Sequence, residues 1–219
     1  MTVFIPTDRS MNLVKRFFPN LSEEIMCQIE KFCQLIKEKN EQINLISRKN
    51  IDQIESMHIL PSLAITKVAN FRKNAKILDI GSGGGFPAIP LAIVYSDRQF
   101  TLVDSIGKKI TAVAGICQSL GLENVECICN RVESIDREFD YITGRAVTNW
   151  EDFKKLAYPK LRKNGKIFYL SGGDLERDAG SKLHDICAMY DSAFCETKKI
   201  IEHIKQERVH RNLFARKKY

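Results

Sequence analysis

Residues 77–92 read ILDIGSGGGFPAIPLA, and this stretch decides the fold. An apolar run containing one acid is followed by four glycines within five residues, and a second apolar run begins after Pro87. A strand, a glycine-rich turn and a helix in this order bind a nucleotide-like ligand in many α/β proteins, because glycine allows the backbone to approach the ligand closely. The ligands that share this pattern are nicotinamide dinucleotides, flavins, nucleoside triphosphates and S-adenosylmethionine.

On the C-terminal side of that turn, short β-rich runs alternate with helical segments. This alternation predicts βαβ crossovers, and therefore an α/β fold with a mostly parallel sheet and helices on both faces. The predicted strands span 75–80, 99–105, 124–130, 139–144 and 165–171, and the predicted helices span 87–95, 107–120 and 149–160. Two further strand-like stretches, 194–204 and 211–217, are joined by only a few residues, so we expect them to pair antiparallel at one side of a seven-stranded sheet.

The segment before the sheet is expected to be helical. Ser22 is a candidate N-cap with acids in the turn that follows it. One apolar face recurs at helical spacing and consists of Ile25, Ile29, Phe32, Cys33 and Ile36. A second helix is expected over 51–66, interrupted or started by Pro61. We therefore predict a helical extension over residues 1–70, packed on a main domain over residues 71–219.

Composition indicates an ordinary globular protein of 219 residues, with 44% hydrophobic and 28% charged residues. No apolar run approaches the roughly 20 residues of a membrane-spanning helix, and the N-terminus lacks the features of a signal peptide. We expect a cytoplasmic location with no membrane partner. Seven cysteines without a C-x-x-C pair predict reduced thiols and no metal site. The net charge of +7 and the basic C-terminus indicate either a polyanionic partner or a solubilising tail.

The acids beside the glycines favour one ligand. The pattern is D-x-G-x-G-x-G, formed by Asp79, Gly81, Gly83 and Gly85, and Phe86 stands where a dinucleotide fingerprint has its third glycine. Asp79 would repel a pyrophosphate but attract the cationic methionine end of S-adenosylmethionine. Asp104 ends the next predicted strand, where a carboxylate accepts hydrogen bonds from ribose hydroxyls of either ligand class. S-adenosylmethionine is favoured, and a dinucleotide oxidoreductase or a turn without ligand are the alternatives.

The acceptor of a methyl group is indicated by what the chain lacks. No Asn-Pro-Pro-Tyr-like motif follows the fourth predicted strand, and no Pro-Cys or Thr-Cys dipeptide supplies a pyrimidine-methylating cysteine. Guanine N7 fits what remains, because it has a free lone pair and needs no general base. Arg145, just past that strand, can donate to guanine O6 or hold a phosphate, or alternatively pair with Asp140 or another carboxylate. A methyltransferase acting on a small molecule or protein, and a noncatalytic RNA-binding protein, are the other open alternatives.

The order of several motifs resembles one family. The matching segments are LDIGSGGGFPAIPLA (78–92), LVDSIGKKITAV (102–113), NRVES (130–134), ITGRAV (142–147) and RNLFARK (211–217), with INLISRKNIDQIESMHIL (43–60) upstream. They occur in the same order in the glucose-inhibited division protein B family, bacterial enzymes that methylate N7 of one guanine in 16S ribosomal RNA. The resemblance covers the chain from about residue 25. It implies a Rossmann-like class I methyltransferase that consumes S-adenosylmethionine and releases S-adenosylhomocysteine. It also implies 16S rRNA or the small ribosomal subunit as partner, and we expect a monomer.

The resemblance also implies roles for individual residues. Cofactor contacts are expected from Gly81 and Phe86 in the turn, from Asp104 at the ribose, and from Val132 and Glu133 near the adenine. Arg145 would lie at the junction of cofactor and acceptor, as the candidate catalytic residue. The residues at positions suited to RNA or the target guanine are Lys108, Arg131 and Arg211. Lys108 is equally interpretable as a solvated lysine at a helix start.

Two positions depart from the family pattern. Pro61 stands where the family usually has an aspartate, in HILPS instead of HILDS, and Ser171 stands where it usually has a lysine. If that lysine contacts RNA in relatives, this chain lacks the contact or uses a neighbour such as Lys166. Neither departure lies in the cofactor motif.

Overall fold

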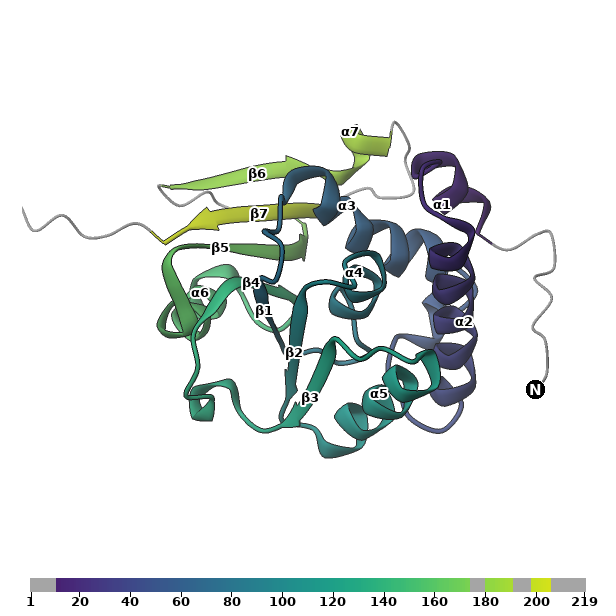
Figure 1. The fold of residues 1–219 in the computed structure, drawn as a ribbon, viewed down its shortest axis with the longest axis horizontal. Coiled ribbons are helices and arrows are strands. Elements are labelled where there is room, and N and C mark those ends of the chain that lie inside the picture. The colour runs from purple at the N-terminus through teal and green to yellow at the C-terminus, as the bar shows by residue number, and fades with distance from the viewer. Residues whose placement is uncertain (1–10, 174–179, 191–197, 206–219) are drawn as a thin grey trace, which may run out of the picture.

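A seven-stranded sheet forms the centre of the computed structural model, which describes residues 11–173, 180–190 and 198–205. The strand order is β3-β2-β1-β4-β5-β7-β6 (Figure 1). The first five strands pair in parallel, whereas β7 is antiparallel to both of its neighbours. The strands are β1 (Lys76–Ile80), β2 (Gln99–Asp104), β3 (Val125–Cys129), β4 (Phe139–Arg145), β5 (Leu161–Gly172), β6 (Ser181–Asp185) and β7 (Lys198–Ile204).

The strand order reverses at β1, which lies between β2 and β4. Crossovers leave this point in opposite directions, so a crevice opens at the carboxyl ends of β1 and β4, where open α/β sheets bind ligands. Both strands are buried almost throughout. Their apolar sequences predicted this, because strands covered on both faces are apolar along their length. The topology therefore places the glycine turn, which follows β1, at the edge of the sheet where a ligand site is expected.

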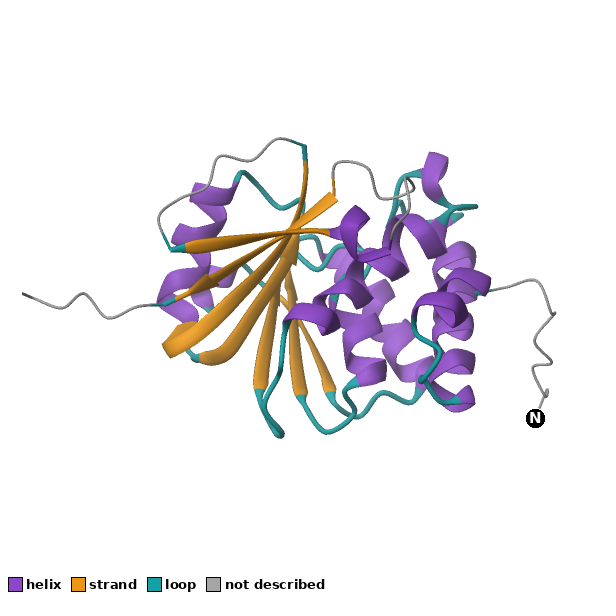
Figure 2. Cartoon of the chain, turned by 90° about the horizontal axis from the view of Figure 1, so that it is seen from above, coloured by secondary structure: helices purple, strands orange, loops and turns teal. Residues whose placement is uncertain are grey.

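Helices cover both faces of the sheet, as predicted, but unequally. One hydrophobic cluster joins α2, α3, α4 and α5 to one face, and a smaller cluster joins α6 to the other. Figure 2 shows the larger helical layer on one side of the sheet and the smaller on the other. The helices are α1 (Asn12–Phe17), α2 (Glu23–Asn40), α3 (Leu60–Val68), α4 (Ala88–Val94), α5 (Gly107–Leu120), α6 (Trp150–Ala157) and α7 (Ile186–Tyr190). Short turns of other helical types are η1 (Arg48–Asn50), η2 (Glu55–Ile59), η3 (Val132–Ser134) and η4 (Tyr158–Lys160).

The N-terminal helices form as the sequence predicts. The Oγ of Ser22 accepts a hydrogen bond from the N–H of Ile25 at 3.3 Å and caps α2. Most of the predicted apolar face is buried, namely Ile29, Phe32, Cys33 and Ile36, while Ile25 is half-buried. This face packs into the same hydrophobic cluster as the sheet. The division of the chain at residue 70 stays a prediction, and the first ten residues of the expected extension lie outside the described part.

The C-terminal part of the sheet differs from the expectation. Both edges of β7 are occupied, by β5 on one side and β6 on the other, so the predicted pairing of 194–204 with 211–217 is wrong. Residues 211–217 lie outside the described residues. The antiparallel partner is β6, which the sequence did not predict as a strand. The sequence of β6, SKLHD, is short and mostly polar. This composition is typical of an edge strand, much of whose surface is exposed.

Candidate active site

The glycine turn after β1 is held in place by a carboxylate from β2. Gly81 has φ +66°, and a Cβ there would lie 2.8 Å from Cγ2 of Val147, so only glycine fits both the conformation and the space. The N–H of Gly83 donates to Oδ2 of Asp104 at 2.8 Å. The N–H of Ile106 donates to the other oxygen, Oδ1, also at 2.8 Å. Asp104 therefore joins the turn to the loop that follows β2.

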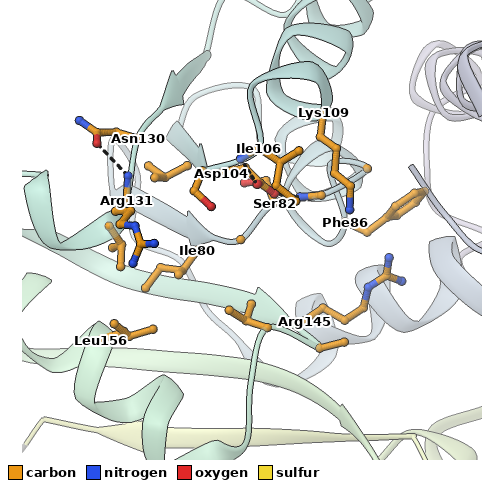
Figure 3. Close-up of a pocket in the computed structure, with 18 of the residues that line it drawn as sticks. Ile80, Ser82, Phe86, Asp104, Ile106, Lys109, Asn130, Arg131, Arg145 and Leu156 are labelled. Carbon is orange, nitrogen blue, oxygen red and sulfur yellow. Dashed lines mark hydrogen bonds between the residues drawn. The ribbon is translucent and has the colours of Figure 1, made fainter. Parts of the chain in front are cut away.

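A cavity of about 550 Å³ opens over this turn (Figure 3). Eight of the predicted site residues line it, namely Gly81, Gly83, Phe86, Asp104, Arg131, Val132, Glu133 and Arg145. Three other predicted residues are not among its lining residues: Asp79 in β1, Gly85 in the turn, and Lys108 in α5. Its neighbour Lys109 does line the cavity, and in Figure 3 its side chain extends from α5 toward Phe86. Arg211 lies outside the described residues.

Asp79 lies beneath the cavity rather than on its wall. The side chain is fully buried, and its Oδ1 accepts a hydrogen bond from Oγ1 of Thr143 at 2.7 Å. Its Oδ2 has no hydrogen-bond partner among the described residues. Burial raises the pKa of Asp79 to about 6, against the opposing effects of the Thr143 hydrogen bond and the charge of Arg145. A buried carboxylate oxygen without a partner is stabilised by an added cation or donor.

Arg145 ends β4 and is half-buried between aromatic and imidazole groups. Its Nη1 lies 2.7 Å from Nδ1 of His58, and its guanidinium carbon lies 4.9 Å from the centre of the Phe86 ring. Burial lowers the pKa of Arg145 to about 10 despite the nearby Asp79, so the side chain remains charged at neutral pH. The alternative pairing with Asp140 is wrong, because Asp140 pairs with Arg72 and Arg162.

His58 is a site residue that the sequence interpretation missed. Arginine can only donate, so Nδ1 of His58 accepts from Arg145 and the neutral ring carries its proton on Nε2. Burial, followed by the charges of Arg145 and Lys198, lowers the pKa of His58 to about 3. His58 belongs to η2, a π-helical turn, and such turns occur frequently at functional sites. His58 could have been noticed in the sequence as part of HIL, in the motif upstream of the glycines. Its hydrogen-bond partner Arg145, however, is 87 residues away in the chain.

A second cavity of about 360 Å³ also has Arg145 among its lining residues. His58, Pro61, Ser171 and Lys198 all line it. Three residues line both cavities, namely Leu45, Arg145 and Ala146. Ala146 has φ +51°, a conformation that costs a non-glycine residue on the order of 1–3 kcal/mol. The two cavities therefore meet at Arg145 and at a strained residue.

The two departures from the family pattern both line this second cavity. Pro61 has no N–H to donate to the carbonyl of Met57, four residues earlier, and Nζ of Lys198 donates to that carbonyl at 3.0 Å. Lys198 pairs in register with Gly172, next to Ser171. Lys166, the neighbour considered above, donates instead to Glu202 at 3.0 Å. Lys198 is thus a cation that lines the same cavity as both departing positions.

The comparisons with known proteins agree on one family. A family profile described as GidB, rRNA small subunit methyltransferase G, matches residues 25–208. The chain belongs to this family. The match confirms the resemblance indicated by the motifs, and it includes the glycine turn, Arg145 and His58.

Curated relatives share the family across almost their whole length. The ribosomal RNA small subunit methyltransferase G of Christiangramia forsetii is 41% identical over 203 residues, covering 88% of this chain and 96% of that protein. The protein of the same name from Flavobacterium johnsoniae is 41% identical over 201 residues, covering 87% and 96%. Both alignments span far more than the cofactor motif.

Solved structures agree on the fold. The yhhF protein of Escherichia coli superposes with a TM-score of 0.52 at 13% identity, covering 68% of this chain and 87% of that one. Together with the strand order, this shows the predicted Rossmann-like class I fold. Among the described residues, no helix has the length and apolar character needed to cross a membrane.

Proposed function

We propose that this protein transfers a methyl group from S-adenosylmethionine to N7 of a specific guanine in 16S ribosomal RNA. The observation that carries the proposal is the position of Arg145, which lines both the cavity over the glycine turn and the second cavity beside it. Two adjoining cavities that share one cation suit a methyl donor in one and an acceptor in the other. Membership of the family supports ribosomal RNA as the acceptor.

The first cavity has the features that S-adenosylmethionine requires. The turn offers backbone groups that no Cβ obstructs, and Asp104 at its wall can accept hydrogen bonds from ribose hydroxyls. Asp79 beneath it has an unpartnered buried oxygen, which suits the ammonium at the methionine end. Val132 and Glu133 line the same cavity, and we propose that they contact the adenine. We include no metal in the proposal.

Methyl transfer to guanine N7 requires the protein mainly to position the two reactants. When bound, S-adenosylmethionine would supply the methyl group of its sulfonium: the lone pair of guanine N7 would form the new N–C bond as the C–S bond breaks in line, with S-adenosylhomocysteine as the leaving group. No proton is removed from the acceptor, so no residue has to act as a base. Arg145 can donate to guanine O6, the neighbour of N7, and thereby orient the base. The guanine becomes positively charged when it is methylated, and a protonated His58 beside Arg145 would repel that charge. The low pKa of His58 keeps its ring neutral at neutral pH.

We propose that three basic residues contact the RNA. Arg131 lines the first cavity and Lys108 is exposed at the start of α5, so both can meet a nucleic-acid phosphate. Arg211 is proposed as the third contact. We further propose that the protein acts as a monomer in the cytoplasm, on the small ribosomal subunit or its RNA.

The decisive experiment is methyl transfer from labelled S-adenosylmethionine to small ribosomal subunits that lack the modification, with the nucleosides identified by mass spectrometry. We expect 7-methylguanosine, its loss in Asp104→Ala, and a reduced but measurable rate in Arg145→Ala. Lys73→Ala is the control, because Lys73 is exposed before β1, away from the carboxyl ends of the strands. Full activity of Arg145→Ala would remove the role given to that residue. A different methylated product would overturn the proposed acceptor.

A further inference from the structure

A shallow hollow of about 520 Å³ adjoins both cavities, and we call it the loop hollow. It is lined by residues 44–49 and Lys109. Three of these seven residues are cations, Arg48, Lys49 and Lys109, and none is a carboxylate. Leu45 and Lys109 also line the first cavity, while residues 45–47 also line the second. The loop hollow is therefore continuous with the proposed cofactor and acceptor sites.

The backbone of the loop hollow is held by hydrogen bonds to the buried side chain of Asn40. Oδ1 of the buried Asn40 accepts hydrogen bonds from the N–H groups of Leu45 at 2.8 Å and Ile46 at 3.0 Å. Leu45 and Ile46 are themselves buried in the core. The carbonyl oxygen of Leu45 lies 3.1 Å from where a Cβ on Gly84 would stand, so the loop is seated directly on the glycine turn. A binding surface on such a loop is preorganised and loses little entropy when a ligand binds.

The cations of the loop hollow are not neutralised within the described part of the chain. Arg48 and Lys49 are exposed on η1, and no recorded hydrogen bond or ion pair between described side chains involves either of them. Lys109 comes from a different element, α5, and also lines the hollow. Uncompensated cations from two elements around one hollow create a positive potential that favours a polyanion.

We infer that the loop hollow binds backbone phosphates of the RNA strand immediately beside the target guanosine. The inference rests on the proposed function and adds to it the path of the substrate. A base that enters the second cavity must leave its stack, and its flanking phosphates then lie outside the rim of that cavity. Residues 45–47 form part of this rim, and Arg48 and Lys49 follow directly. Arginine and lysine at this position hold the strand in register without reading its sequence.

The test is the salt dependence of binding to small ribosomal subunits that lack the modification. Arg48→Ala/Lys49→Ala removes two cations that line only the loop hollow, and Lys37→Ala/Lys73→Ala removes two exposed cations elsewhere. Each lost phosphate contact lowers the slope of log affinity against log salt by about 0.7 to 0.9. The wild type should therefore lose roughly tenfold more affinity than the loop variant between 50 and 200 mM salt. The control double variant should keep the wild-type slope.

Two measurements separate this inference from the proposed function. Affinity for S-adenosylmethionine and the thermal midpoint should be unchanged in the loop variant, which shows that it is folded. If the wild type methylates the subunits and the loop variant keeps the wild-type slope, the inference is wrong and the proposed function stands. If the wild type neither binds nor methylates the subunits, both are wrong.

Discussion

Asp104 holds the glycine turn through Gly83: the carboxylate oxygen Oδ2 accepts the Gly83 N–H at 2.8 Å, while Oδ1 accepts from Ile106. The residue proposed to contact the ribose therefore also shapes the turn on which the cofactor is proposed to lie. A backbone N–H paired to a carboxylate makes a strong, charge-assisted hydrogen bond. Substitutions at Asp104 can remove its acceptor oxygens in steps, because asparagine keeps one of the two and alanine keeps neither.

Asp104→Ala should weaken S-adenosylmethionine binding by about 100-fold or more, since hydrogen bonds to charged groups contribute roughly 1.5–3 kcal/mol each. Asp104→Asn should be intermediate, because one of its two acceptor oxygens remains. Isothermal titration calorimetry measures both, with Asp136→Ala as a charge-matched control on an exposed loop. Wild-type affinity in Asp104→Ala would contradict the assignment of this cavity to the cofactor.

Local spacing explains why the sequence predicted the glycine turn and its carboxylate partner, both of which line the first cavity. A carboxylate two residues before a glycine run, and another at the end of the next strand, define the turn and its partner without knowledge of distant contacts. Lys108 was predicted from the family resemblance and not from spacing. Its neighbour Lys109 lines the first cavity and Lys108 does not, because one residue along a helix turns a side chain by about 100°.

Long-range contacts explain what the sequence did not predict. His58 and Arg145 meet only because η2 packs over the end of β4, and no periodicity records such a contact. Strand β6 was missed because edge strands carry few apolar residues, so the alternation that marks a buried strand is weak.

Asp79 should make stability depend on pH below neutrality. Its pKa of about 6 in the folded protein exceeds its ordinary value of 3.8, so the folded state retains a proton that the unfolded chain has lost between these values. The stabilising contribution is complete below about pH 4 and is lost as pH rises through 6, amounting to about 3 kcal/mol at most. Asp79→Asn should remove this dependence. Thermal midpoints of both proteins from pH 4.5 to 7.5 test it, and parallel curves would refute it.

The same carboxyl group should make cofactor binding depend on pH in the opposite direction. The ammonium at the methionine end favours the ionised form of Asp79, so affinity for S-adenosylmethionine should rise as pH increases through 6. Asp79→Asn should bind more weakly at pH 7.5 and with a flatter profile. Calorimetric titrations at pH 5.5, 6.5 and 7.5 measure this. A wild-type affinity that does not change over this range would show that Asp79 is not coupled to the ligand.

Two glycine substitutions should have opposite effects on stability. Alanine at Gly84 places a Cβ 3.1 Å from the Leu45 carbonyl oxygen, where the loop is held by Asn40, and should cost about 1–3 kcal/mol. Alanine at Gly115 meets no atom within 4 Å inside α5 and should stabilise by about 0.5–1 kcal/mol. Urea denaturation measures both. Equal stability of the two variants would mean that the loop does not press on the turn.

His58 should orient Arg145 as a neutral hydrogen-bond acceptor, and its substitutions test this separately from folding. His58→Ala removes the acceptor 2.7 Å from Nη1 and should lower kcat for methyl transfer about 10- to 100-fold, with cofactor affinity near that of the wild type. His58→Asn places an amide oxygen near the position of Nδ1 and should restore most of the rate. Because the pKa of His58 is about 3, kcat should show no titration of this residue between pH 6 and 9. Single-turnover rates across this pH range distinguish the possibilities. A rate in His58→Asn as low as in His58→Ala would exclude the acceptor role, and a wild-type step near pH 6.5 that both variants lack would indicate that His58 carries a proton.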